Sequence, residues 1–262
     1  KTQVYVALPK AQKKLQIIFS VIGGLLIWLF LSELFGYGPG IPQFSNDFSV
    51  GVSEIIWFFP IVILSVLYGL EFEIFDKITG KLSGFIENKR FIFAVIAGLI
   101  LGLSGTFVPM VMYSGEEPMR ELINNSALYS AFGLLIIAAF KIPLINICIK
   151  FGWRGGIFFP AIFCGVCLGF AFAAVVPCNA VFCCAVATAA LVSTITHMPF
   201  IVAALLMICF PANCFVWILG TSCLVTVLPD FVKDGKTDIK GVVLLIKLKQ
   251  KVQNKINHFR DV

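Results

Sequence analysis

The chain has 262 residues, of which 59% are hydrophobic and only 13% are charged, and its 20 Lys and Arg against 14 Asp and Glu give a formal net charge of +6. Soluble domains contain about 45–50% apolar and about 25% charged residues, so this composition excludes a soluble globular domain. It also excludes a disordered chain, because disorder requires low hydrophobicity. The composition therefore predicts an all-α polytopic membrane protein.

The first half of the chain contains apolar stretches that are long enough to cross a membrane. A helix needs about 20 apolar residues to span the hydrocarbon core. Stretches of this length lie at residues 15–35, 54–75, 91–112 and 127–149. The second is expected to continue as an amphipathic helix to Phe85. We therefore predict long membrane-spanning helices in this half.

The apolar stretches of the second half are shorter. They cover residues 157–176, 180–194, 200–210 and 214–228. Pro199 and Pro211 interrupt them, and proline ends or kinks a helix. Short, interrupted apolar segments are typical of the binding sites of transporters. We predict short broken helices here, with one long, kinked helix as the alternative.

The loop charges predict an orientation. Lys and Arg are frequent in the lead-in 1–14, in the loop 77–90 and in the tail 230–262, whereas the loop 36–53 has none. By the positive-inside rule, the start and the tail are cytoplasmic, and the loops 36–53 and 113–126 face outward. The tail is expected to be solvated, with contact to anionic lipid as the alternative. It lacks the interleaved aromatic residues of a nucleic-acid-binding segment, so no nucleic-acid partner is expected.

Paired glycines precede one of the short apolar segments. Gly155 and Gly156 lead into Ile157 and Phe158, and Pro160 falls in the first helical turn, where proline is favoured. The first N–H groups of a helix lack intrahelical partners and lie at the positive end of its dipole. At membrane depth such a terminus is suited to a dehydrated anion, which it holds without a full positive charge. The alternative is a glycine-rich helix start that only packs.

Lys141 lies in the interior of the predicted span 127–149. A charge inside the membrane is a functional hypothesis by default. Lys141 is a candidate pathway charge that raises the positive potential along an anion path. The alternatives are that it snorkels to the interface or binds a backbone carbonyl.

Other reactive side chains have simpler interpretations. His197 lies just before a predicted helix start, where a hydrogen-bonded structural role is favoured over pH sensing. The nine cysteines, including the pair Cys164 and Cys167, lie in or beside apolar runs. We interpret them as small packing residues rather than disulfides or metal ligands.

Several segments together resemble a known family. The stretch Gly155-Gly-Ile-Phe-Phe-Pro-Ala-Ile-Phe-Cys-Gly165 resembles the GGxFxPxxxxG signature of the CLC chloride channels and proton-coupled anion antiporters. Thr196-His-Met-Pro-Phe200 resembles the later T-[RH]-x-P motif of that family. Lys141 stands where the family usually has Lys or Arg, and Tyr113-Ser-Gly-Glu-Glu117 resembles a linker of some bacterial members. The order of segments fits over about residues 15–229.

The resemblance implies an architecture. CLC subunits are similar to two inverted halves around an anion path, and residues 15–229 match only the second half. This implies a missing N-terminal half, either as part of a longer transporter, which the lack of an initiator Met at Lys1 favours, or as a separate partner. The resemblance also implies a homodimer through the helices at 15–34, 199–210 and 214–228.

The resemblance further implies a site. The backbone amides of Ile157 and Phe158 would coordinate a central chloride or related halide, Gly155 and Gly156 would let it approach, and Pro160 would start the helix. The halide is the transported ligand, and no cofactor or metal is expected. The implied function is anion transport through a CLC-type pore, without enzymatic activity.

Some positions depart from the family pattern. Residues 229–262 contain no Tyr, although the family has a pore tyrosine there. Ile201 and Ile208 replace the Thr and Glu that follow the later motif. These departures leave a non-conducting scaffold or half-subunit as the alternative function. They also leave the choice between channel and antiporter open.

Overall fold

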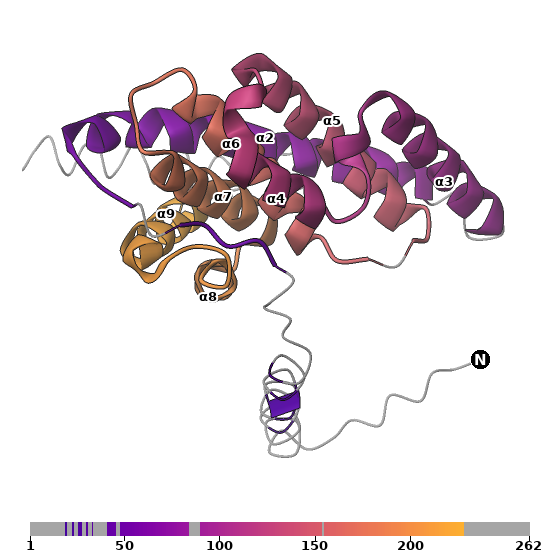
Figure 1. Cartoon of the computed structure of the whole chain (residues 1–262). Helices are drawn as coiled ribbons and strands as arrows, with labels where there is room; N and C mark the ends of the chain where they lie inside the picture. The colour runs from indigo at the N-terminus through magenta and orange to yellow at the C-terminus, as the bar shows by residue number, and fades with distance from the viewer. Residues whose placement is uncertain are drawn as a thin grey trace, which may run out of the picture. The chain divides into compact units, whose positions relative to one another are not determined.

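The computed structural model describes residues 41–45, 48–83, 90–153 and 155–227, together with Phe19, Gly23, Leu26, Ile27, Phe30 and Glu33, which are helical. The chain divides into two compact units, Lys1–Ile41 and Pro42–Val262, and the helices below belong to the second. All regular secondary structure in its described residues is helical (Figure 1). The predicted all-α fold class is confirmed.

Long helices come first and short ones follow. The elements are α2 (Val52–Ser83), α3 (Arg90–Phe107), η1 (Pro109–Val111), α4 (Glu116–Asn125), η2 (Ser126–Leu128), α5 (Ala131–Lys150), α6 (Phe158–Ala173), α7 (Ala180–Thr196), α8 (Pro199–Leu206), η3 (Ala212–Cys214) and α9 (Phe215–Val227). Helices α2 and α5 are long and apolar enough to cross a membrane. Helices α3, α6, α7 and α9 are apolar but shorter. This order agrees with the predicted change from long spans to short segments.

Helices α6 and α7 form the centre of the unit (Figure 1). Every residue from 161 to 171 in α6 and from 181 to 194 in α7 is buried. Both helices are apolar or rich in small residues on all sides, the pattern of a helix surrounded by protein. Helices α2, α5 and α9 pack against this pair. The pair therefore fixes where α6 begins, and with it the position of the glycine motif.

Two glycines bring α6 and α7 into close contact. A Cβ added at Gly165 would lie 2.5 Å from the Cα of Thr188, and one added at Gly169 would lie 2.3 Å from the Cα of Cys184. The earlier glycine of α6 meets the later residue of α7, so the two helices run antiparallel. The small-xxx-small spacing of Gly165 and Gly169 allows this close packing.

Gly169→Ala is expected to lower the free energy of unfolding by about 1–3 kcal/mol, the cost of overpacking a tight core. The backbone of Cys184 must move to make room for the new methyl group. Gly102→Ala in α3 is the matched control, because a Cβ there meets nothing within 4 Å. Thermal unfolding of the protein in detergent measures both variants. Equal melting temperatures for the two would contradict the close contact.

The last part of the chain is broken into separate short helices, as predicted. His197 has φ of 53° and ends α7. Pro199 is the first residue of α8, where its missing N–H costs no helical hydrogen bond. Pro211 begins the turn into α9, and its carbonyl accepts from the N–H of Cys214 at 2.9 Å. One long, kinked helix is therefore excluded for this segment.

Helix α3 is shorter than the predicted span. It ends at Phe107 rather than near Met112. Pro109 has no N–H and disfavours the helical conformation for the residue before it. Val108 accordingly has φ of −135° and ψ of 83°. The chain then turns through η1 instead of continuing the span.

The stretch 113–126 was expected to be a loop, and this expectation is wrong. It contains α4, which buries Met119 and Leu122 on one face. Residues three apart lie on the same side of a helix, so two apolar side chains suffice to dock a short amphipathic helix. After α4, the hydroxyl of Tyr129 donates to the carboxylate of Glu121, and this hydrogen bond raises the pKa of Tyr129.

Some predictions concern residues that the structure does not describe. They are the lead-in 1–14, most of the helix at 15–35, and the tail 230–262. The cytoplasmic placement of both ends and the dimer contact through 15–34 therefore stay predictions.

Candidate functional site

The start of α6 is an open helix terminus. Helix α6 begins at Phe158, and the N–H of Ala161 donates to the carbonyl of Ile157 at 3.1 Å. The N–H groups of Ile157, Phe158 and Phe159 come before this bond, so the helix provides no acceptor for them. Pro160 has no N–H and lies in the first turn, as predicted. Within the described residues, no side chain caps this end of α6.

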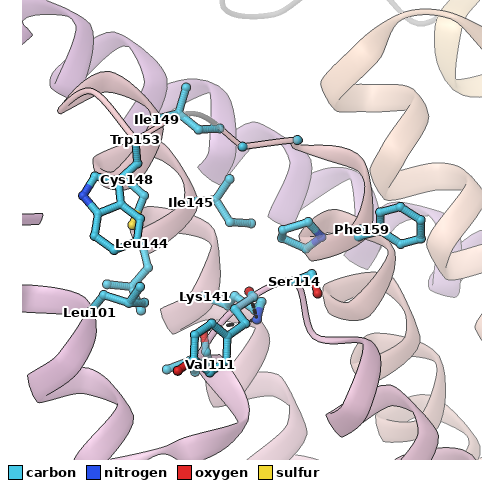
Figure 2. Close-up of a pocket in the computed structure, with 14 residues that line it drawn as sticks. Leu101, Val111, Ser114, Lys141, Leu144, Ile145, Cys148, Ile149, Trp153 and Phe159 are labelled. Atoms are coloured by element: carbon cyan, nitrogen blue, oxygen red, sulfur yellow. Dashed lines mark hydrogen bonds between the residues drawn. The ribbon is translucent and has the colours of Figure 1, made fainter. Parts of the chain in front are cut away.

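A cavity of about 350 Å³ lies beside this terminus (Figure 2). It is bounded by α3, the segment around η1, α5 and the start of α6. Its lining is mostly apolar and comprises Leu101, Val111, Tyr113, Ser114, Lys141, Leu144, Ile145, Cys148, Ile149, Trp153, Gly155, Gly156, Phe159 and Pro160. Figure 2 shows Trp153 and Phe159 on opposite sides, with Lys141 between them near Ser114. The cavity thus joins the glycine motif to the buried lysine.

Gly155 and Gly156 leave the front of the terminus open. A Cβ added at either residue would meet no atom within 4 Å, and both residues are exposed. Neither is among the glycines with positive φ, so the backbone conformation does not itself require glycine. What the pair provides is space, because a ligand can approach the backbone where no side chain stands in front of it.

Lys141 is buried and binds backbone carbonyls. Its side chain is 1% exposed, and its Nζ donates to the carbonyls of Val111 at 3.1 Å, Met112 at 3.3 Å and Tyr113 at 3.2 Å. An ammonium has three N–H bonds, so these carbonyls use all of them. Nζ also lies 4.7 Å from the ring centroid of Phe163, within cation–π range. Carbonyl binding, one of the predicted alternatives, is the one that the structure supports.

The charge of Lys141 nevertheless remains beside the cavity. The segment that it holds, with η1 at its start, supplies Val111, Tyr113 and Ser114 to the cavity wall. A cation in such a weakly polar environment produces a stronger potential than it would in water. Lys141 therefore fixes the wall, and its three N–H groups are directed at carbonyls rather than at a ligand.

Ser114 and Trp153 are among the lining residues that the sequence motifs do not identify. Ser114 adds a hydroxyl to the wall next to the carbonyls that Lys141 binds. Trp153 donates from Nε1 to the carbonyl of Ala94 at 2.9 Å, which ties the turn after α5 to α3. Gly152 forms that turn with φ of 105°. A glycine just after an apolar run is a sequence signal for the end of a helix. Ser114 and Trp153 are positioned by contacts between segments that are distant in the chain. The sequence does not reveal such contacts.

Ionisable side chains on α2 pair with other helices. The Nε2 of His197 lies 3.6 Å from Oε1 of Glu73, and Asp76 forms an ion pair with Lys150 of α5 at 2.8 Å. These two contacts join α2 to α7 and to α5. His197 ends α7 and contacts a neighbouring helix, in agreement with a structural role.

The cysteines of α6 pack in the core. Cys164 and Cys167 are both fully buried, and the Sγ of Cys164 lies 3.9 Å from the carbonyl of Ala138. Among the residues that the structure describes, no group of three His, Cys, Asp or Glu could hold a metal ion.

Comparison with known proteins yields one family and several relatives. The family described as "Voltage gated chloride channel" matches residues 9–228. A protein named "Putative ion-transport protein YfeO" from Escherichia coli O1:K1 / APEC is 34% identical over 85 residues, which is 32% of this chain and 20% of that protein. The protein of the same name from Escherichia fergusonii is 33% identical over 75 residues, which is 28% of this chain and 18% of that protein.

The alignments thus span about a fifth of the length of these curated relatives. The family match, in contrast, extends over α2 to α9. It includes the glycine motif, Lys141 and the broken helices that follow them. The chain therefore belongs to the voltage gated chloride channel, or CLC, family, whose members are integral membrane proteins.

Proposed function

We propose that this chain transports an anion, chloride or a related halide, at the start of α6. The observation that supports the proposal most is the cavity beside an uncapped helix terminus, which Gly155, Gly156 and Pro160 line. The amides of Ile157 and Phe158 bind the anion, Gly155 and Gly156 leave room for its approach, and Pro160 starts the helix. This role is transport rather than enzymatic catalysis.

The electrostatics of the cavity suit transport. Amides at a helix terminus carry partial positive charge and attract an anion that has lost its water. Lys141 adds a full charge beside the cavity, but its three N–H bonds are directed at carbonyls. The anion therefore gains from the potential without forming an ion pair. Binding of this kind is favourable yet weak enough for release, which conduction requires.

The orientation and the partners are parts of the same proposal. The loop 36–53 faces outward, and the start and tail of the chain are cytoplasmic. The chain pairs with a second copy through the helices at 15–34, 199–210 and 214–228. In support, Phe200, Ile201, Phe215 and Val216 are exposed apolar residues on α8 and α9. A CLC-type N-terminal half, in the same polypeptide or a separate one, completes the anion path.

Chloride efflux from liposomes tests the proposal. The protein, in its natural complete form, is reconstituted into chloride-loaded liposomes, and efflux is followed with a chloride electrode. We expect efflux well above that of protein-free liposomes. A correctly folded protein without efflux would contradict anion transport. That result would favour a non-conducting scaffold, the alternative to which Ile208 and the lack of Tyr in residues 229–262 point.

A further inference from the structure

Cys178 and Cys183 meet at the start of α7. The side chain of Asn179 caps this helix by accepting from the N–H of Phe182 at 3.1 Å, and the carbonyl of Asn179 accepts from the N–H of Cys183 at 3.0 Å. Cys178 is therefore the residue before the cap, and Cys183 is the fourth residue of the helix. Side chains at these two positions pack against each other in the hydrophobic staple. The two side chains are accordingly placed next to each other at the start of α7.

The turn that carries Cys178 is held against the start of α2. The hydroxyl of Ser53 donates to the carbonyl of Pro177 at 2.7 Å and lies 3.4 Å from the Sγ of Cys178. The carboxylate of Glu54 accepts from the N–H of Asn179 at 2.9 Å. These contacts keep the Cys178 thiol beside α7.

Accessibility distinguishes the two cysteines. Cys178 is partly exposed, whereas Cys183 is fully buried. The neighbouring Cys184 is also buried, but its Sγ lies 3.7 Å from the carbonyl of Val166 on α6. A reagent in solution therefore reaches Cys178 first, and Cys183 is the thiol placed to react with it next.

We infer that Cys178 and Cys183 form a reversible disulfide by exchange with a low-molecular-weight disulfide. The Cys178 thiolate attacks one sulfur of that disulfide, so that a mixed disulfide forms and one small thiol leaves. The Cys183 thiolate then attacks the Sγ of Cys178, and a second small thiol leaves. Two protein thiols are oxidised, one small disulfide is reduced, and the two protons end on the released thiols.

This pair lies away from the proposed anion site. Because α6 and α7 are antiparallel, the start of α7 is at the opposite end of the pair from the start of α6. In the proposed orientation it lies on the outward side with the residues before α2, where disulfides persist. The outward location of the cysteine pair rests on the proposed function. The disulfide exchange does not, because it is tested on purified protein.

Peptide mapping tests the inference. The full chain in detergent is incubated with oxidised glutathione, blocked with iodoacetamide and digested with chymotrypsin, which cleaves after Phe182. We expect the peptide with Cys178 to remain joined to the peptide with Cys183. The link should persist in Cys184→Ser and disappear in Cys183→Ser. In Cys183→Ser, Cys178 should instead accumulate as its mixed disulfide with glutathione.

Three results would overturn the inference. One is recovery of Cys178 as a free thiol in the wild type. Another is an equal amount of glutathione adduct at Cys178 in the wild type and in Cys183→Ser. The third is a link that depends on Cys184 rather than Cys183. None of these results bears on anion efflux, so the two proposals can fail independently.

Discussion

Gly156→Leu is expected to reduce chloride efflux by about tenfold or more while leaving the fold intact. A Cβ at Gly156 meets no atom within 4 Å, so the leucine side chain enters open space in front of the terminus. There it excludes an anion from the amides of Ile157 and Phe158. One hydrogen bond to a charged group contributes about 1.5–3 kcal/mol, and about 1.4 kcal/mol corresponds to a factor of ten. Efflux from liposomes measures the change.

Gly102→Leu is the matched control for this variant. Gly102 is also exposed and also has open space where a Cβ would stand, but it lies in α3 and does not line the cavity. We expect efflux close to the wild type. Unchanged efflux in Gly156→Leu, or an equal loss in both variants, would be incompatible with an anion path at the start of α6.

Lys141→Met is expected to lower the free energy of unfolding by about 3 kcal/mol or more. The substitution keeps the length of the side chain but removes three hydrogen bonds to the carbonyls of residues 111–113. A buried polar group left without a partner costs about 1–3 kcal/mol. The segment that forms the cavity wall should then loosen. Thermal unfolding in detergent measures the stability. Chloride efflux measures whether the loosened cavity wall impairs transport.

Lys150→Met in the same helix is the control for Lys141→Met. Lys150 pairs with Asp76, and their side chains are 31% and 42% exposed. Ion pairs this exposed contribute about 0–1 kcal/mol, so we expect a small effect. Lys141→Arg keeps the charge and should retain more efflux than Lys141→Met. Similar small losses of stability for Lys141→Met and Lys150→Met would contradict the structural role of Lys141.

The helical architecture could be predicted from the sequence because apolar length and proline positions determine it. Pro199 and Pro211 marked the breaks between α7, α8 and α9. The small-xxx-small spacing of Gly165 and Gly169 allows the close contact of α6 and α7, since only glycine leaves room for another backbone there. The same local rules also explain the error at α3, where Pro109 ended the helix inside an apolar run.

The composition of the site could be predicted only in part. The glycine pair and Pro160 are contiguous in sequence, so the motif identified the helix terminus directly. The carbonyl partners of Lys141 lie about 30 residues before it, and no local pattern connects them. Ser114 likewise comes from a segment distant from the glycine motif, and the bond of Trp153 to Ala94 joins residues 59 apart in the chain. Helix α4 was missed because its ten residues are too few and too charged to resemble a membrane span.

The central claim is that an anion binds the free amides at the start of α6. The most direct measurement is anomalous diffraction from crystals of the protein soaked in bromide. We expect an anomalous peak within hydrogen-bonding distance of the N–H groups of Ile157 and Phe158, in front of Gly155 and Gly156. A cavity filled by a side chain or lipid, with bromide bound only elsewhere, would contradict the account.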